Sequence, residues 1–142
     1  MMAESLPKIS DAEWTVMRVF WENGECPVGE VIERLSDTTD WKPRTIQTLV
    51  RRLHGKGALS RRDADEKAGR GYLYAAAVSE GDCEHAASRS FLGNVFGGEL
   101  APFLANLVEK ESFSEAELEE LRQILESGKE DRSNKKPENK NQ

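Results

Sequence analysis

The sequence predicts a mainly α-helical protein with a small β-hairpin, and three observations support this class. Apolar residues recur at helical spacing up to about residue 57. They then alternate with polar residues on both sides of a polar loop at positions 63–70, as in two short strands. Helical spacing returns from residue 79. The 142 residues suit about one domain by length, and the change of pattern divides them into domains 8–78 and 79–127 and a tail, 128–142.

Capping signals place the first three helices. Ser10 followed by Glu13 has the capping-box spacing, so we expect a helix to begin there. Asn23-Gly24 is expected to end it, because glycine favours helix C-termini. A second helix is predicted near residues 29–35 and a third over 43–56. The third begins with a proline, which is favoured at the first helical position.

The third helix is predicted to have one apolar and one polar face. Its apolar positions cluster within about 100° of arc; they are Ile46, Leu49, Val50 and Leu53. The opposite face carries Arg44, Thr48 and Arg51, flanked by Thr45 and Arg52 on one side and Gln47 on the other.

After the third helix, residues 58–62 and 71–75 are predicted to form the hairpin. Tyr72 and Tyr74 lie on one face of it and are expected to cover the core, with a phosphate contact as the alternative. The second half is predicted to form helices over 79–96 and 99–110 and a last one that begins at the Ser114–Glu117 capping box. The tail from Gly128 contains no apolar residue and is expected to be disordered.

The charge is unevenly distributed. Net charge is −6 overall, but residues 1–78 hold 12 basic and 12 acidic side chains and residues 79–142 hold 8 and 14. The stretch 42–62 carries seven Lys and Arg residues and no acid. A solvated surface usually mixes both signs, so this stretch favours an anionic partner over an ordinary helix face.

Three helices followed by a hairpin are the winged variant of the helix-turn-helix, whose third helix fits the major groove of DNA. We expect base contacts from Arg44, Thr45, Thr48 and Arg51, with Gln47 beside them. Phosphate contacts are expected from Lys42, Arg52, Lys56 and Arg61, and Arg70 at the hairpin tip is placed to reach the adjacent minor groove or backbone. The predicted partner is double-stranded DNA.

The C-terminal helices carry more apolar surface than a thin helical layer can hide. The residues that would remain exposed to solvent are Phe91, Phe96, Leu100, Phe103, Leu104, Leu118, Leu121 and Leu125. Such a patch is unusual on a monomer, so we expect this helical arm to form a symmetric homodimer, which suits a palindromic site. The alternative is that the arm folds back on the winged domain.

Other classes have less support. The first residues lack the pattern of a signal peptide, and no apolar run approaches the ~20 residues of a membrane span, so we expect a cytoplasmic protein. With only His54 and His85 and no nucleophile or phosphate-loop motif, we expect no enzyme, catalytic residue, metal or cofactor. Two alternatives stay open: a protein-docking module, and a zinc or redox sensor built from Cys26, Cys83 and His85.

Several stretches resemble the penicillinase-repressor (BlaI/MecI/CopY) family. They are Ile9-Ser10-Asp11-Ala12-Glu13-Trp14 with Val16-Met17 and Trp21, the segment 39–49 with Arg52-Leu53 and Lys56-Gly57, Ser88-Arg89-Ser90-Phe91-Leu92 with Gly97-Gly98, and Leu118-Glu119-Glu120-Leu121-Arg122. The resemblance covers about residues 8–127. It implies a dimeric winged-helix repressor on a dyad operator.

The resemblance also implies a route of derepression. In antibiotic-responsive members of that family, a membrane-bound sensor protease triggers cleavage of the repressor in its dimerisation helices. The matching position here is Asn106-Leu107, although the resistance repressors carry Phe in place of Leu107. Lys42 likewise replaces a small capping residue common in the family. The copper-responsive branch ends in a cysteine-rich motif, and no Cys or His follows His85 here, so copper sensing by that route is not expected.

Overall fold

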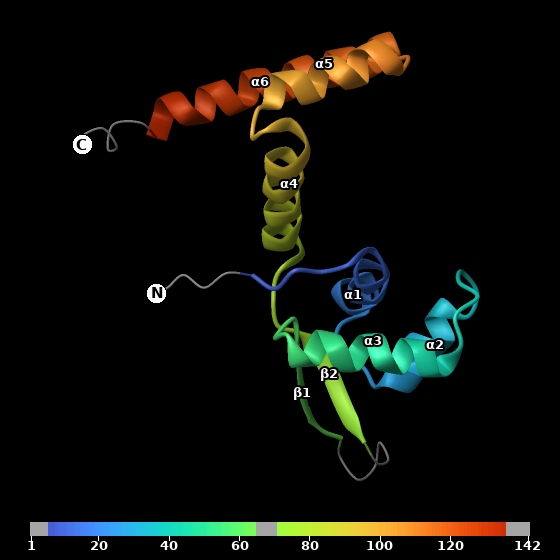
Figure 1. Ribbon diagram of the computed structural model, residues 1–142. Helices are drawn as coiled ribbons and strands as arrows, with labels where there is room; N and C mark the ends of the chain where they lie inside the picture. The colour runs from blue at the N-terminus through green and yellow to red at the C-terminus, as the bar shows by residue number, and fades with distance from the viewer. Residues whose placement is uncertain (1–5, 65–70, 136–142) are drawn as a thin grey trace. The chain divides into compact units, whose positions relative to one another are not determined.

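The computed structural model describes residues 6–64 and 71–135, with the side chains of the last helix described to residue 128. In chain order its elements are α1 (Asp11–Asn23), α2 (Val28–Leu35), α3 (Pro43–Gly55), β1 (Leu59–Asp63), β2 (Tyr72–Ala76), α4 (Glu80–Phe96), α5 (Leu100–Lys110) and α6 (Glu115–Lys135). Three helices followed by an antiparallel hairpin confirm the predicted winged helix-turn-helix, and further helices follow it (Figure 1).

The predicted caps of α1 are confirmed. The Ser10 hydroxyl accepts the Glu13 N–H at 3.2 Å, and the Glu13 carboxylate accepts the Ser10 N–H at 3.0 Å. At the other end Gly24 has a φ of 81°, a conformation that costs little only without a Cβ. These two signals set the length of α1 and therefore which of its side chains reach the core.

The core lies between α1, α2, α3 and the hairpin. Its buried members are Val16, Met17, Val19, Phe20, Cys26, Val31, Leu35, Ile46, Leu49, Val50, Leu53, Ala58, Leu59 and Tyr74. Each large apolar side chain buried here contributes roughly 1.5–3 kcal/mol to folding. Because α3 supplies the four residues that its periodicity predicted, the core determines which face of this helix is exposed.

The second strand of the hairpin has backbone partners on two sides. β1 and β2 are antiparallel, with Leu59 opposite Ala76 and Asp63 opposite Tyr72. Cys26, in the segment before α2, exchanges two backbone hydrogen bonds of 3.0 Å with Tyr74. β2 is therefore paired with β1 along one edge and with Cys26 at Tyr74 on the other, which attaches the hairpin to the segment before α2.

Each strand begins one residue later than the alternating pattern predicted. The N–H of Ala58 donates to the carbonyl of Leu53 at 2.9 Å, so Ala58 still closes the end of α3. Gly71 has a φ of 106°, which is a turn conformation rather than an extended one. Local closure of the neighbouring turns therefore decides the strand limits.

By internal contacts the chain divides into two units, 1–91 and 92–142. This differs from the expected boundary after residue 78 because the start of α4 belongs to the first unit. The Trp21 indole donates to the carbonyl of Val78 at 3.0 Å, and Cys83 on α4 is buried. The winged unit therefore includes α4 up to Phe91.

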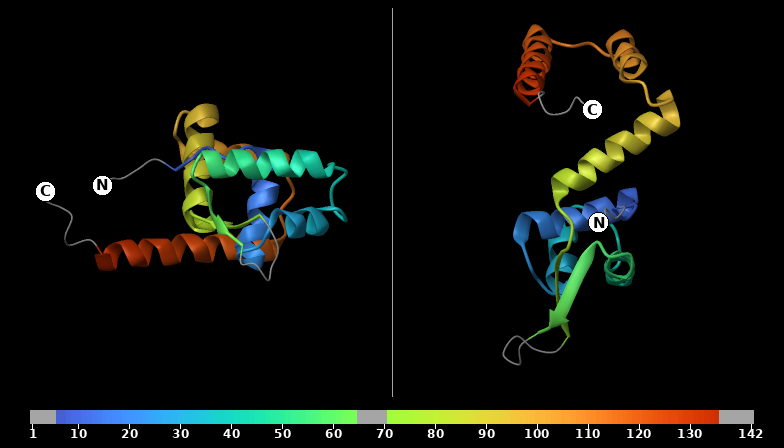
Figure 2. Two further views of the ribbon diagram at one scale, coloured as in Figure 1. Left: turned by 90° about the horizontal axis from the view of Figure 1, so that it is seen from below. Right: turned by 90° about the vertical axis from the view of Figure 1, so that its left-hand side faces the viewer.

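Within the second unit, α5 and α6 are separate helices joined by a short linker (Figure 2). α6 begins at the predicted capping box, in which Ser114 and Glu117 exchange hydrogen bonds of 2.9 and 3.0 Å. The helix continues to Lys135, past Gly128, where we expected disorder to begin. One glycine costs a helix only about 1 kcal/mol, and the Glu, Lys and Arg residues around it favour helix.

Among the described residues no single helix is long and apolar enough to span a membrane. Only α4 and α5 taken together reach the required length and hydropathy, and they are bent by 82° at their break.

Candidate nucleic-acid interface

The exposed face of α3 is the candidate reading surface. Ile46, Leu49, Val50 and Leu53 anchor the helix in the core. On the other side Arg44, Thr45, Gln47, Arg51 and Arg52 are exposed, and Thr48 is half-buried. The structure therefore brings together, on one solvent-facing surface, all of the residues that the sequence predicted to contact bases.

The cations of this face are not neutralised by the fold. Within the described part of the chain, Lys42, Arg44, Arg51 and Arg52 take part in none of the ion pairs. Lys42 occupies the N-cap of α3 without a side-chain cap hydrogen bond, and Pro43 follows at the first helical position. A surface of free arginines beside the uncapped start of a helix attracts anions.

A small hollow borders the same face. Val28, Val50 and Tyr74 form its apolar part, and Gln47 and Arg51 of α3 stand beside them. Its volume is about 290 Å³. Gln47 and Arg51 therefore lie next to apolar surface.

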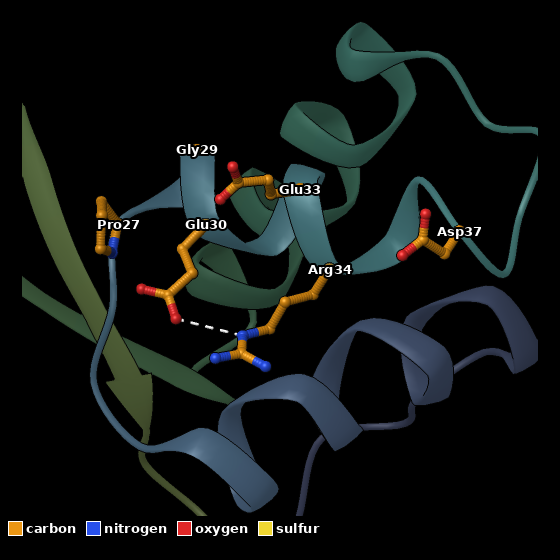
Figure 3. A pocket seen from close by; sticks show the side chains of 6 residues that line it. All are labelled: Pro27, Gly29, Glu30, Glu33, Arg34 and Asp37. Carbon is orange, nitrogen blue, oxygen red and sulfur yellow. Dashed lines mark hydrogen bonds and ion pairs between the residues drawn. The ribbon is translucent and has the colours of Figure 1, made fainter.

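The helix before α3 has a different surface. On α2, the Arg34 guanidinium pairs with the Glu30 carboxylate at 3.1 Å, and Glu33 and Asp37 lie along the same shallow hollow (Figure 3). Acidic side chains repel phosphates, so α2 does not extend the positive surface of α3.

Lys56 lies in a different environment from the other predicted phosphate contacts. Its ammonium donates to the Glu13 carboxylate and to the Lys8 carbonyl, both at 2.7 Å. Glu13 is 3% exposed. Burial raises the pKa of Glu13, but the hydrogen bonds from Lys56 and Ser10 and the Lys56 charge outweigh burial, so this pKa lies below its ordinary value.

The sequence did not reveal this pair. Glu13 was interpreted only as a capping residue and Lys56 only as a phosphate contact. Because the two residues are 43 positions apart in the sequence, helical or strand periodicity cannot indicate their contact. The sequence also did not reveal the pairing of Arg62 on β1 with Glu25, through two bonds of 2.8 Å.

The hairpin gives its two tyrosines different roles. Tyr74 is 8% exposed and lies in the core, as predicted, whereas Tyr72 is 41% exposed. The Arg61 guanidinium stacks over the Tyr72 ring at 4.0 Å, which holds that cation on the hairpin surface. Arg70, predicted at the hairpin tip, lies outside the described residues.

The cysteines and histidines are not gathered into a site. Burial and the nearby Glu30 carboxylate raise the pKa of Cys26 to about 11, and burial and Asp82 raise the pKa of Cys83. His54 lies edge-on to Tyr74 at 6.1 Å, and His85 is exposed. Within the described residues no group of three potential metal ligands forms, so the structure offers no support for the zinc or redox alternative.

The predicted dimerisation residues divide into two groups. Phe91, Leu100, Leu121 and Leu125 are exposed in the single chain, together with Val95, Val108 and Ile124. Phe96, Phe103, Leu104 and Leu118 are half-buried, and the Phe96 and Phe103 rings meet at 5.5 Å. Asn106 and Leu107 lie inside α5, with Asn106 exposed and Leu107 half-buried.

Comparison with known proteins identifies the family. Residues 9–127 match the penicillinase repressor family. The penicillinase repressor of Bacillus licheniformis is 40% identical over 126 residues, which cover 89% of this chain and 95% of the relative. The methicillin resistance regulatory protein MecI of Staphylococcus aureus (strain N315) is 38% identical over 118 residues, which cover 83% of this chain and 93% of that protein.

Two solved structures are similar to part of this chain. They are the DNA binding domain of the repressor BlaI, with a TM-score of 0.48, and the monomeric form of Bacillus licheniformis BlaI in complex with the blaP half-operator, with a TM-score of 0.47. Each is 41% identical and covers 56% of this chain and 93% of its own. By the family match and the identity to curated relatives, the chain belongs to the penicillinase repressor family, whose members are DNA-binding transcriptional repressors and not enzymes.

Proposed function

We propose that this chain is a dimeric transcriptional repressor that binds a palindromic operator through α3. The observation that carries the proposal is the exposed, unpaired cationic face of α3, mounted on a helix whose other face is locked in the core. A related repressor, BlaI, was solved in complex with a half-operator, which supports the same partner for this chain.

The side chains of α3 divide by the contacts that they can make. Arg44 and Arg51 can donate two hydrogen bonds each to a guanine edge, and Thr45 and Thr48 can bond a base or pack on a thymine methyl. Gln47 can pair with adenine, and the apolar part of the hollow beside it could contact a thymine methyl. These residues would read the sequence.

Lys42, Arg52 and Arg61 would contact phosphates and set the register on the duplex. Three such contacts in each of two chains predict that the logarithm of affinity falls against the logarithm of salt with a slope of roughly −5. Lys56 is left out of this set because Glu13 already neutralises its ammonium.

Dimerisation would use the apolar surface of the arm. Leu121, Ile124 and Leu125 follow one stripe of α6 and are exposed in the single chain. A second copy related by two-fold symmetry can cover this stripe with its own and would hold two winged units on half-sites one or more helical turns apart.

Derepression would follow from cutting or disordering that arm. The position matching the family cleavage site, Asn106-Leu107, lies within α5. A protease binds its substrate in extended form, so α5 would have to open locally before the cut. The two winged units would then bind their half-sites independently, and the gain in operator affinity from simultaneous binding would be lost. A membrane-bound sensor protease is the proposed partner.

The test is selection of binding sites from a random duplex library by the purified full chain, followed by titration of the selected duplex at several salt concentrations. We expect a two-fold symmetric site, bound by a dimer with an affinity of about 10⁻⁸–10⁻¹¹ M and the salt slope given above. Failure to enrich any site would refute the proposal and favour a protein-docking role for the winged unit.

A further inference from the structure

We propose that Lys56 is a positioning residue, which fixes the C-terminal end of α3 to the start of α1 and so holds the reading face at its working angle. The inference rests on the proposed function, because it concerns how α3 is held against DNA. It assigns Lys56 a different role from the neighbouring cations Lys42 and Arg52.

The first step of the argument is geometric. Lys56 caps α3, and its backbone N–H donates to the Arg52 carbonyl at 3.0 Å. The ammonium of its side chain donates to Glu13 Oε1 and to the Lys8 carbonyl, both at 2.7 Å. One residue therefore connects the last turn of the reading helix to the first turn of α1 and to the segment before it.

The second step concerns the carboxylate. Glu13 is buried, and its Oε1 accepts both the Lys56 ammonium and the Ser10 N–H. If Lys56 moved to a phosphate, Glu13 would lose its only ion-pair partner within the described residues. A buried carboxylate that loses its ion-pair partner is strongly destabilising, so the ammonium is favoured to stay with Glu13.

The third step concerns charge. The Lys56–Glu13 pair has no net charge, so it adds little to the attraction between α3 and phosphates. It acts instead on orientation, because Arg51 and Arg52 lie one turn before Lys56 on the same helix. A helix end released from α1 would present these guanidinium groups at a variable angle.

The experiment measures operator binding of the full-length chain over a range of salt concentrations for Lys56→Met and Glu13→Gln, with Lys42→Met as the matched control. Lys42 is exposed at the other end of α3 and takes part in no ion pair among the described residues. Affinities are compared at a temperature at which circular dichroism shows each variant folded. Glu13→Gln carries the test alone if Lys56→Met does not fold.

We expect Lys56→Met and Glu13→Gln to weaken binding by a similar factor, about 2- to 30-fold, with the double variant no weaker than either single one. Lys56→Met should leave the salt slope unchanged, because it removes no phosphate contact. Lys42→Met should make the slope of a dimer shallower by about 2. Glu13→Gln is decisive because it leaves the Lys56 charge in place and removes only its anchor.

The inference is overturned if Lys56→Met reduces the salt slope as Lys42→Met does, or if Glu13→Gln leaves binding unchanged or tightens it. Absence of operator binding by the unaltered chain is a separate result, which would overturn the proposed function itself.

Discussion

Replacement of Leu125 by Asp tests the dimer most directly. Leu125 is 62% exposed in the single chain. Full burial of a leucine side chain contributes roughly 1.5–3 kcal/mol, so covering the exposed part would contribute about 1–2 kcal/mol per chain, and about 2–4 kcal/mol in a symmetric dimer. Leu125→Asp removes this contribution and adds a carboxylate that must be desolvated.

The dimer dissociation constant should therefore rise by about 30-fold or more. Sedimentation velocity over a range of protein concentrations measures this change, and titration of a full operator against a half-operator measures its effect on DNA binding. Gln123→Asp is the matched control, because it adds the same charge about 200° around α6. A Leu125→Asp chain that stays dimeric and binds the full operator as before would refute the role of this stripe.

Three further outcomes are expected. Arg51→Ala should cost about 1–3 kcal/mol of operator binding and relax one base position in a selection experiment, whereas an equal loss on every sequence would make Arg51 a phosphate contact. Leu53→Ala, at a position that is 0% exposed, should lower the free energy of unfolding by about 2–5 kcal/mol in urea titrations, and a loss below about 1 kcal/mol would contradict the described core. The pKa of Glu13 is lowered by folding, so the stabilisation from this group should be fully present above its ordinary pKa of 4.5 and be lost as the pH falls through the lower, folded value. The free energies of unfolding of the native chain and of Glu13→Gln, compared from pH 7 to pH 3, measure this stabilisation. A difference between the two that does not shrink on acidification would contradict the assignment.

Local signals in the sequence predicted most of the winged unit. The Ser10–Glu13 box, Gly24 and Pro43 each act within a few residues, so the limits of α1 and the start of α3 could be inferred before any contact was known. The four apolar positions of α3 lie on one stripe, and all four are buried. Because the reading face is the complement of that stripe, it was predictable as well.

What the sequence did not show depends on contacts between distant positions. The pairing of Lys56 with Glu13 is invisible to periodicity, so Lys56 was grouped with the phosphate contacts. The start of α4 belongs to the first unit, and Cys83 on it is buried, although no change in composition marks this. A disordered tail was predicted to begin at Gly128, although one glycine does not stop a helix with a strong cap and many helix-favouring residues.

The two buried cysteines make this chain convenient for spectroscopy. With a pKa of about 11, roughly one Cys26 thiol in a thousand is ionised at pH 8, and only the thiolate reacts with common labels. Cys83 is also buried and its pKa is raised. A single cysteine introduced on the exposed side of α6 can therefore carry a spin label while both native thiols remain in place. Distances between the labels of two chains would then report how the arms meet, in the free protein and on DNA.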